Sequence, residues 1–270
     1  MDFGAELLFP FQWLVSAIMV AFHDGLSAAG MPAASGWTWT LSIIGLVLAV
    51  RAALLPVSLK QIRAQRRMRL LQPDLMRLQE KYKGKTDPLS RQAMAQEQMA
   101  LYKKHGTNPF SACLPVLVQV PFFFALFTVL SGITTAANSG KGIGAMSHAQ
   151  VAQFEASSIF GAPLSATPLH GTPEAGNVVA VWILSLVMIL AMTAAQFITQ
   201  KHIMTVSGYG KVSADATPGP FLRQQKAVLY ALPIVFGAGG IIFPLGVLIY
   251  WTTTNLWTMV QQFVLNPRSG

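Results

Sequence analysis

The chain contains few charged residues and a single cysteine. Asp, Glu, Lys and Arg together account for 11% of its 270 residues, whereas 53% are hydrophobic. A soluble domain of this size has about a quarter of its residues charged. So few charges cannot cover a water-exposed surface, which indicates that lipid surrounds much of the chain. The lone Cys113 excludes an internal disulfide framework and a cysteine-based zinc site.

Long apolar segments predict a polytopic, all-α membrane protein. A bilayer core of about 30 Å is crossed by about 20 apolar residues in a helix. The apolar run 227–265 is too long for one crossing, and three glycines with Pro244 supply a break within it. The sequence therefore predicts five transmembrane helices, at residues 37–59, 109–131, 177–200, 227–238 and 241–265.

The five predicted spans contain no Asp, Glu, Lys or His. A proton-coupled transporter would need carboxylates or imidazoles there, and an intramembrane hydrolase would need a nucleophile beside a base. Gly84-Lys85-Thr86 resembles the end of a phosphate-binding loop, but Gln79 stands where the first glycine belongs. We therefore expect no enzyme activity, no catalytic residue, no metal site and no cofactor.

The distribution of positive charge predicts the orientation of the spans. The segments 60–108 and 201–226 and the short tail 266–270 hold 17 of the 19 basic residues. The opposite side, which includes the loop 132–176, holds only Lys141, against five acidic residues. Because positive loops stay in the cytoplasm, we expect the N-terminus outside and the C-terminus inside.

Residues 1–36 form an N-terminal segment that precedes the first predicted span. Met1 to Glu6 contains no Lys or Arg, so a signal peptide is a weak interpretation. On a helix, an apolar stripe and a polar stripe separate: Leu7, Phe11, Leu14, Ile18 and Phe22 against Gln12, Ser16, His23 and Ser27. This pattern favours an amphipathic helix in the membrane interface over a further span.

The basic segment 60–108 has the pattern of a helical hairpin. Apolar residues recur at helical spacing at Met68, Leu71, Leu75, Leu78 and Tyr82. Asp87-Pro88 is typical of an N-cap followed by proline at the first helical position, and predicts a second helix running to Lys104. Gly84 marks the turn between the two helices.

A structured hairpin predicts a surface that contacts a partner. Anionic lipid head groups and ribosomal RNA both match its positive charge. The candidate contact residues are Arg63, Arg66, Arg67, Lys81, Lys83 and Lys85. The alternative is a solvated charged face that only sets the topology.

Arg51 is the one charged residue inside a predicted span. It lies about 18 Å along the helix from Trp39, and Leu54, Leu55 and Val57 extend the apolar run beyond it. An arginine at the centre of a span costs about 2.5–3.5 kcal/mol. Either its side chain reaches the cytoplasmic surface, or it faces a wet cavity among the helices.

Five separated motifs resemble those of the YidC membrane protein insertase family, in the order in which that family has them. They are Val50-Arg51 with Leu54-Leu55-Pro56, Leu71-Gln72-Pro73 with Glu80-Lys81-Tyr82-Lys83, the run from Leu101 to Pro109, Cys113-Leu114-Pro115 with Gln119-Val120-Pro121, and Pro244-Leu245-Gly246 with Tyr250-Trp251-Thr252. The resemblance extends from about Trp37 to Leu265.

The resemblance implies five helices around a hydrophilic groove that is closed toward the outside, with the cytoplasmic hairpin attached. It implies that Arg51 is the groove arginine and that Gln196 and Trp251 line the groove; Gln119 is a further polar residue in a span. It also implies a bacterial cell membrane and, as partners, nascent membrane proteins, the ribosome and the Sec translocon, but no DNA. The chain lacks the large periplasmic domain of Gram-negative members and a long basic tail, and so resembles the shorter Gram-positive or actinobacterial type.

Composition and charge alone leave three functions open. The first is an insertase in which Arg51 attracts the acidic terminus of an entering chain. The second is a small-molecule or ion transporter that uses Arg51 as an anion site. The third is a chaperone that holds membrane proteins without inserting them. The motifs favour the insertase.

Overall fold

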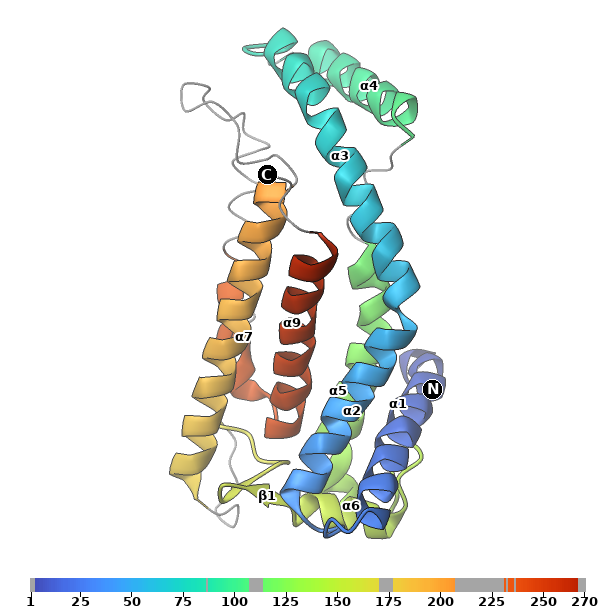
Figure 1. Cartoon of the computed structure of the whole chain (residues 1–270), viewed down its shortest axis with the longest axis vertical. Coiled ribbons are helices and arrows are strands. Elements are labelled where there is room, and N and C mark those ends of the chain that lie inside the picture. The colour runs from blue at the N-terminus through green and yellow to red at the C-terminus, as the bar shows by residue number, and fades with distance from the viewer. Residues whose placement is uncertain are drawn as a thin grey trace. The chain divides into compact units, whose positions relative to one another are not determined.

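The computed structural model describes residues 3–85, 87–106, 114–169, 177–206, 231, 233–235 and 237–266, and this part of the chain is mainly helical (Figure 1). The first half holds α1 (Phe3–Ala28), α2 (Gly36–Ala53), α3 (Leu55–Lys81), α4 (Pro88–Lys104) and α5 (Leu114–Asn138). There follow α6 (His148–Glu155), the antiparallel strands β1 (Ser158–Ile159) and β2 (Ala162–Pro163), α7 (Val178–Val206), the short 3₁₀ helix η3 (Gly240–Ile242) and α9 (Leu245–Leu265).

Within the described residues, three helices are long and apolar enough to cross a membrane, which confirms the polytopic all-α class. They are α2, residues Gln119–Asn138 of α5, and α7. Large apolar side chains of α7 point outward, including Ile183, Leu186 and Leu190. Exposed in water these side chains would be costly, whereas in lipid they are in a matching solvent.

The count of five spans stays a prediction. Half of the predicted span 227–238 lies outside the described residues, as do the loop residues 207–226 and the tail 267–270. A break precedes the last helix, which begins at Leu245 and not at the predicted residue 241. Residue Phe243 is extended between η3 and α9, as a residue before proline prefers.

The first span ends earlier than its predicted limit at residue 59. Helix α2 stops at Ala53, Leu54 forms the junction, and α3 starts at Leu55 with Pro56 in its first turn. Proline has no N–H to donate to the carbonyl four residues earlier, so the helix breaks there. The break lies only a few residues beyond Arg51.

The described chain divides into two compact units. The first comprises residues 1–53, 117–195 and 234–257, and the second comprises residues 54–116, 196–233 and 258–270. In the first unit α1 lies along α2 (Figure 1). The packing is close, because a methyl group on Gly45 of α2 would lie 2.7 Å from the ring of Phe22 on α1.

Helix α1 turns its polar stripe toward the protein. Gln12 donates a hydrogen bond to Thr128 of α5 at 3.0 Å, and the Ser16 hydroxyl accepts one from the Ala145 N–H at 2.8 Å. Away from these contacts, Trp13 and Leu14 of α1 are 53% and 41% exposed. This arrangement provides an apolar face for lipid. The placement of α1 in the membrane interface stays a prediction.

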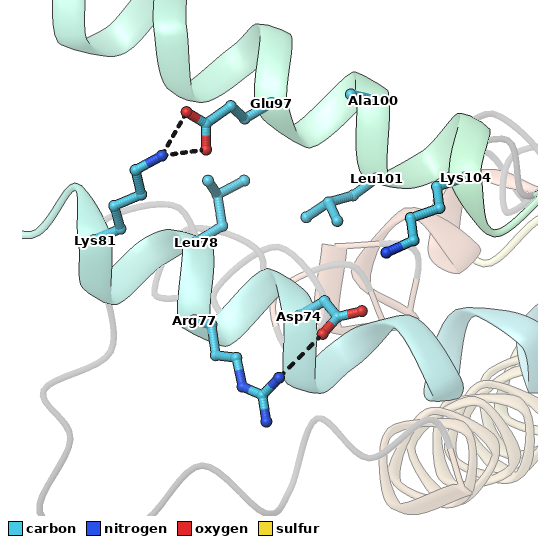
Figure 2. A pocket seen from close by; sticks show the side chains of 8 residues that line it. All are labelled: Asp74, Arg77, Leu78, Lys81, Glu97, Ala100, Leu101 and Lys104. Atoms are coloured by element: carbon cyan, nitrogen blue, oxygen red, sulfur yellow. Dashed lines mark hydrogen bonds and ion pairs between the residues drawn. The ribbon is translucent and has the colours of Figure 1, made fainter.

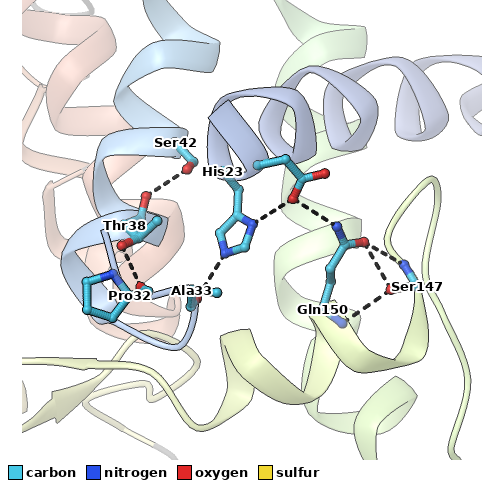
Figure 3. Close-up of polar contacts among 8 residues, drawn as sticks. His23, Pro32, Ala33, Thr38, Ser42, Ser147 and Gln150 are labelled. Carbon is cyan, nitrogen blue, oxygen red and sulfur yellow. Dashed lines mark hydrogen bonds and ion pairs between the residues drawn. The ribbon is translucent and has the colours of Figure 1, made fainter. Parts of the chain in front are cut away.

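His23 connects α1 to the turn before α2 (Figure 3). Its buried ring is stacked on Trp39, with 3.8 Å between the ring centroids. One ring nitrogen lies 3.0 Å from an Asp24 carboxylate oxygen, and the other lies 2.9 Å from the Ala33 carbonyl oxygen. Which of the two ring nitrogens donates depends on the tautomer of the ring.

The loop around β2 caps the start of α9. The Leu164 carbonyl accepts from the Gly246 N–H at 2.9 Å, and the Ala166 carbonyl accepts from the Leu245 N–H at 3.0 Å. These bonds satisfy N–H groups that a helix leaves free at its N-terminus. Leu164 is completely buried, and a methyl group on Gly246 would lie 3.3 Å from Phe154. The described residues are therefore densely packed at this end of the first unit.

In the second unit, α3 and α4 form the predicted hairpin. Asp87 caps α4 by accepting from the Ser90 N–H at 2.8 Å, and Gly84 has the positive φ of +82° that a tight turn needs. Leu71, Leu75 and Tyr102 form a small core between the helices. The N-cap, the turn and the buried stripe are thus confirmed at these positions, while the Met68 side chain lies outside the described part.

Candidate substrate groove

Arg51 is a partly buried cation near the end of α2. The preceding turns of this helix bury Trp39, Ile43 and Leu46. This packing holds the helix that carries Arg51 in a fixed orientation. Among the residues that the structure describes, no carboxylate forms an ion pair with Arg51. A guanidinium has five N–H donors, so this side chain can still bind an anionic or polar group.

A group of uncharged polar side chains lies beside Arg51 in the first unit. Gln119 of α5 donates a hydrogen bond to the Tyr250 hydroxyl of α9. The same hydroxyl interacts with Thr254 one turn further along α9, and electrostatically with Arg51. The structure therefore joins Gln119, one of the four predicted groove residues, to Tyr250, and Arg51 belongs to the same unit.

Trp251 lies next to Tyr250 but belongs to an aromatic cluster. Its ring centroid is 5.4 Å from that of Phe123 and 5.5 Å from that of Phe243. The side chain is partly buried. Aromatic pairs at such distances hold one another in fixed orientations. Trp251 thus adds a rigid apolar surface next to the polar group.

Gln196, the fourth predicted groove residue, is partly buried on α7. It belongs to the second unit, whereas Arg51, Gln119 and Trp251 belong to the first. Its role as a lining residue remains a prediction.

The six candidate contact residues of the hairpin are all exposed, but they differ in their partners. Lys81 forms a 2.6 Å ion pair with Glu97 of α4, and Lys83 a 3.1 Å pair with Glu80. The Lys85 ammonium lies 5.2 Å from the centre of the Tyr82 ring. Lysine side chains of this surface are therefore partly engaged within the hairpin.

Arg66 has an internal role that the sequence did not reveal. Its guanidinium donates to the Leu265 carbonyl at 2.8 Å and to the Asn266 side chain at 3.3 Å. His202 of α7 adds a 2.8 Å hydrogen bond to the Asn266 carbonyl. A cation at the C-terminal end of a helix satisfies free carbonyls and the helix dipole. Arg66 therefore ties α3 to the end of α9.

An open pocket of about 440 Å³ also lies between α3 and α4 of the hairpin (Figure 2). Leu78 and Leu101 form its apolar wall, and the Lys81–Glu97 pair lies at one end. The hydrogen bonds from Lys81 and from Tyr82 hold the pKa of Glu97 below its ordinary value. Glu97 is thus a charged anchor between the two helices at neutral pH.

Comparison with known proteins identifies the family. The family model described as 60Kd inner membrane protein matches residues 31–269. The chain belongs to the 60Kd inner membrane protein family. The matched range contains α2, the hairpin, α5, α7 and α9, and so includes Arg51, Gln119 and Tyr250.

Curated relatives confirm the resemblance seen in the motifs. A protein of Streptomyces avermitilis named membrane protein insertase YidC is 42% identical over all of this chain and 61% of its own length. Proteins of the same name from Tropheryma whipplei and Bifidobacterium longum are 41% and 34% identical. The matches cover 100% and 95% of this chain, and 87% and 74% of those proteins. The chain is thus a multi-pass membrane protein of a bacterial insertase family.

Two residues of this family member were missed by reasoning from the sequence. Tyr250 stands in one of the family motifs, but the sequence gives no sign of its hydrogen bond with Gln119. Glu97 carries no sequence signal except its place on the second hairpin helix, opposite Lys81. Both residues make their contacts with a different helix, which the sequence alone does not reveal.

Proposed function

We propose that the chain is a membrane protein insertase. It receives hydrophobic segments from the cytoplasm in a polar groove at Arg51 and releases them into lipid. The observation that carries this proposal is a partly buried arginine without an ion pair among the described residues, in the same unit as the hydrogen-bonded, uncharged Gln119 and Tyr250. The names of the relatives support the same activity.

Arg51 acts by attracting an acidic group near the terminus of the entering chain. Two unit charges 4 Å apart attract by about 1 kcal/mol in water and about 4 kcal/mol at an effective dielectric constant of 20. Because Arg51 is partly buried, its attraction energy for a carboxylate is several times that of a water-exposed arginine. Because the neighbouring groups are neutral, they do not compete with the arriving carboxylate.

Hydrophobic burial then drives the release. Transfer of the apolar segment into lipid contributes about 25 cal/mol per Å² of buried apolar surface. With the N-terminus outside and the C-terminus inside, as the charge distribution favours, the membrane potential adds about 2.3 kcal/mol per charge per 100 mV for an acidic terminus that moves outward. This cycle needs no nucleotide.

The hairpin is the proposed contact surface for the ribosome and for anionic lipid head groups, and the Sec translocon is a further partner. Arg63 and Arg67 are exposed on the N-terminal half of α3. A polybasic surface gains about 1 kcal/mol per Lys or Arg near an anionic membrane.

The test is insertion into proteoliposomes that contain only this protein. The substrate is a single-span protein with an acidic terminus, compared with the same protein whose Asp residues are replaced by Asn. Arg51→Ala should slow the acidic substrate strongly and the neutral one little, and Arg51→Lys should restore part of the difference. Lys141→Ala removes an exposed cation elsewhere and serves as the control. Equal insertion by Arg51→Ala and the unaltered protein would refute electrostatic capture, and substrate-independent ion flux would favour a transporter.

A further inference from the structure

The turn between β1 and β2 presents a bulky aromatic residue in a backbone conformation that such residues avoid. Phe160 and Gly161 connect the two strands, with φ angles of +49° and +80°. A two-residue turn of this kind favours Asn-Gly, and a positive φ is an outlier for a bulky side chain. Phe160 is nevertheless 70% exposed. Because strained residues cluster at functional sites, this exposed ring calls for a role.

The β1–β2 turn lies where two long apolar helices begin (Figure 1). The Phe160 ring contacts Trp37, the second residue of α2, edge to face with 5.3 Å between the ring centroids. The Gly161 carbonyl accepts a hydrogen bond at 3.3 Å from the N–H of Asn177, directly before α7. Since α2 and α7 are both long and apolar enough to cross a membrane, the turn lies beside the boundary between the apolar core and the head groups.

The surface around this turn is apolar. Trp37 is exposed, as are Val178 and Val179 in the first turn of α7. The segment 156–169, which contains both strands, has no charged residue. Exposed in water these side chains would be costly, whereas aromatic rings are favoured where a bilayer meets water. The lipid interface is therefore the partner that matches this surface.

We propose that Phe160 and Trp37 form an aromatic anchor, which inserts into the head-group boundary of the leaflet where α2 and α7 begin. The charge distribution favours the outer leaflet. A close backbone contact makes the anchor rigid, since a methyl group on Gly36 would collide with the Ser158 carbonyl oxygen. The anchor holds the starts of α2 and α7 at a fixed depth. This role goes beyond the proposed insertase function and does not depend on it.

Photo-crosslinking to lipid tests the contact. A diazirine derivative of phenylalanine, whose carbene reacts with lipid or with water, replaces Phe160 in phosphatidylglycerol and phosphatidylethanolamine liposomes that contain only this protein. The same derivative at the exposed Lys141 is the control. We expect mass spectrometry to find adducts with the upper acyl chains from position 160 and mainly water products from position 141. Water products from both positions, or crosslinks to a second copy of the chain in place of lipid, would overturn the proposal.

Thiol labelling tests whether the anchor sets the depth of α7. Ile183 is exposed and lies about 8 Å further along the helix than Val178. Ile183→Cys is introduced together with Cys113→Ser, which removes the single natural cysteine. Labelling by a membrane-impermeant maleimide added outside the liposomes should be slow. It should rise several-fold with Phe160→Asn, which removes the ring and accepts the positive φ, and should stay slow with Phe160→Trp.

Two results of the labelling would contradict the anchor. Equal labelling with and without Phe160→Asn would show that the ring does not set the depth. Faster labelling together with a lower unfolding temperature of Phe160→Asn in detergent micelles would show a folding defect in place of lost anchoring. The proposal requires faster labelling in the liposomes and an unfolding temperature in detergent that does not fall.

Discussion

A small substitution at Gly36 tests how firmly the helix that carries Arg51 is held. Gly36 is the first residue of α2, and a methyl group there would collide with the Ser158 carbonyl oxygen of β1. The obstacle is backbone, so the helix or the strand pair must move. Overpacking of this kind costs about 1–3 kcal/mol, and the better helix propensity of alanine returns at most about 1 kcal/mol. Gly36→Ala should therefore lower the free energy of unfolding by about 1–2 kcal/mol.

Gly25→Ala is the matched control in the same unit. Gly25 lies near the end of α1, and no atom lies within 4 Å of the position that its methyl group would take. Here only helix propensity changes, so the free energy of unfolding should stay equal or rise by up to about 1 kcal/mol. Unfolding is followed by heat or denaturant in detergent micelles, with helix content as the signal. Equal stability of the two variants would refute the close contact between α2 and β1.

Three further predictions concern the hairpin and α1. Leu71→Ala should destabilise the hairpin by about 2–5 kcal/mol, because Leu71 is completely buried; amide hydrogen exchange in α3 and α4 should accelerate, and unchanged exchange would contradict the observed core. Because the pKa of Glu97 is lowered in the folded hairpin, its contribution is present above the ordinary glutamate pKa of about 4.3 and is lost as the pH falls through the lower folded value. After correction for the intrinsic effect of pH on amide exchange, the protection of hairpin amides should therefore fall on acidification by more in the unaltered protein than in Glu97→Gln. His23→Leu leaves the Ala33 carbonyl without its partner, and should lower the unfolding temperature by more than the exposed control His148→Leu.

Local features were predictable from the sequence because neighbouring residues determine them. The cap at Asp87, the proline that follows it and the turn at Gly84 each have a conformational preference that operates over three or four residues. The break at Pro244 has the same origin. The apolar stripe of α3 was recognisable because helical spacing places its residues on one face.

Features that depend on packing between distant segments were not predictable. The end of α2 at Ala53 was missed because an apolar run gives no sign of where a helix breaks, although Pro56 offered a partial signal. Arg66 was assigned to an external surface, and its bonds to the end of α9 connect residues about 200 positions apart. The hydrogen bond between Tyr250 and Gln119 likewise connects two helices that are 131 positions apart at these residues.

The central claim is that entering chains pass beside Arg51, and photo-crosslinking tests it most directly. A photoreactive phenylalanine derivative replaces Trp251, which lies in the aromatic cluster next to Tyr250, and in a second protein it replaces Leu186, an outward-facing residue of α7. A ribosome-stalled nascent chain with an acidic terminus is the target. We predict strong crosslinks from position 251 that weaken when Arg51→Ala is added, and weak crosslinks from position 186. No crosslink from position 251, or equal crosslinks that ignore Arg51, would contradict the account.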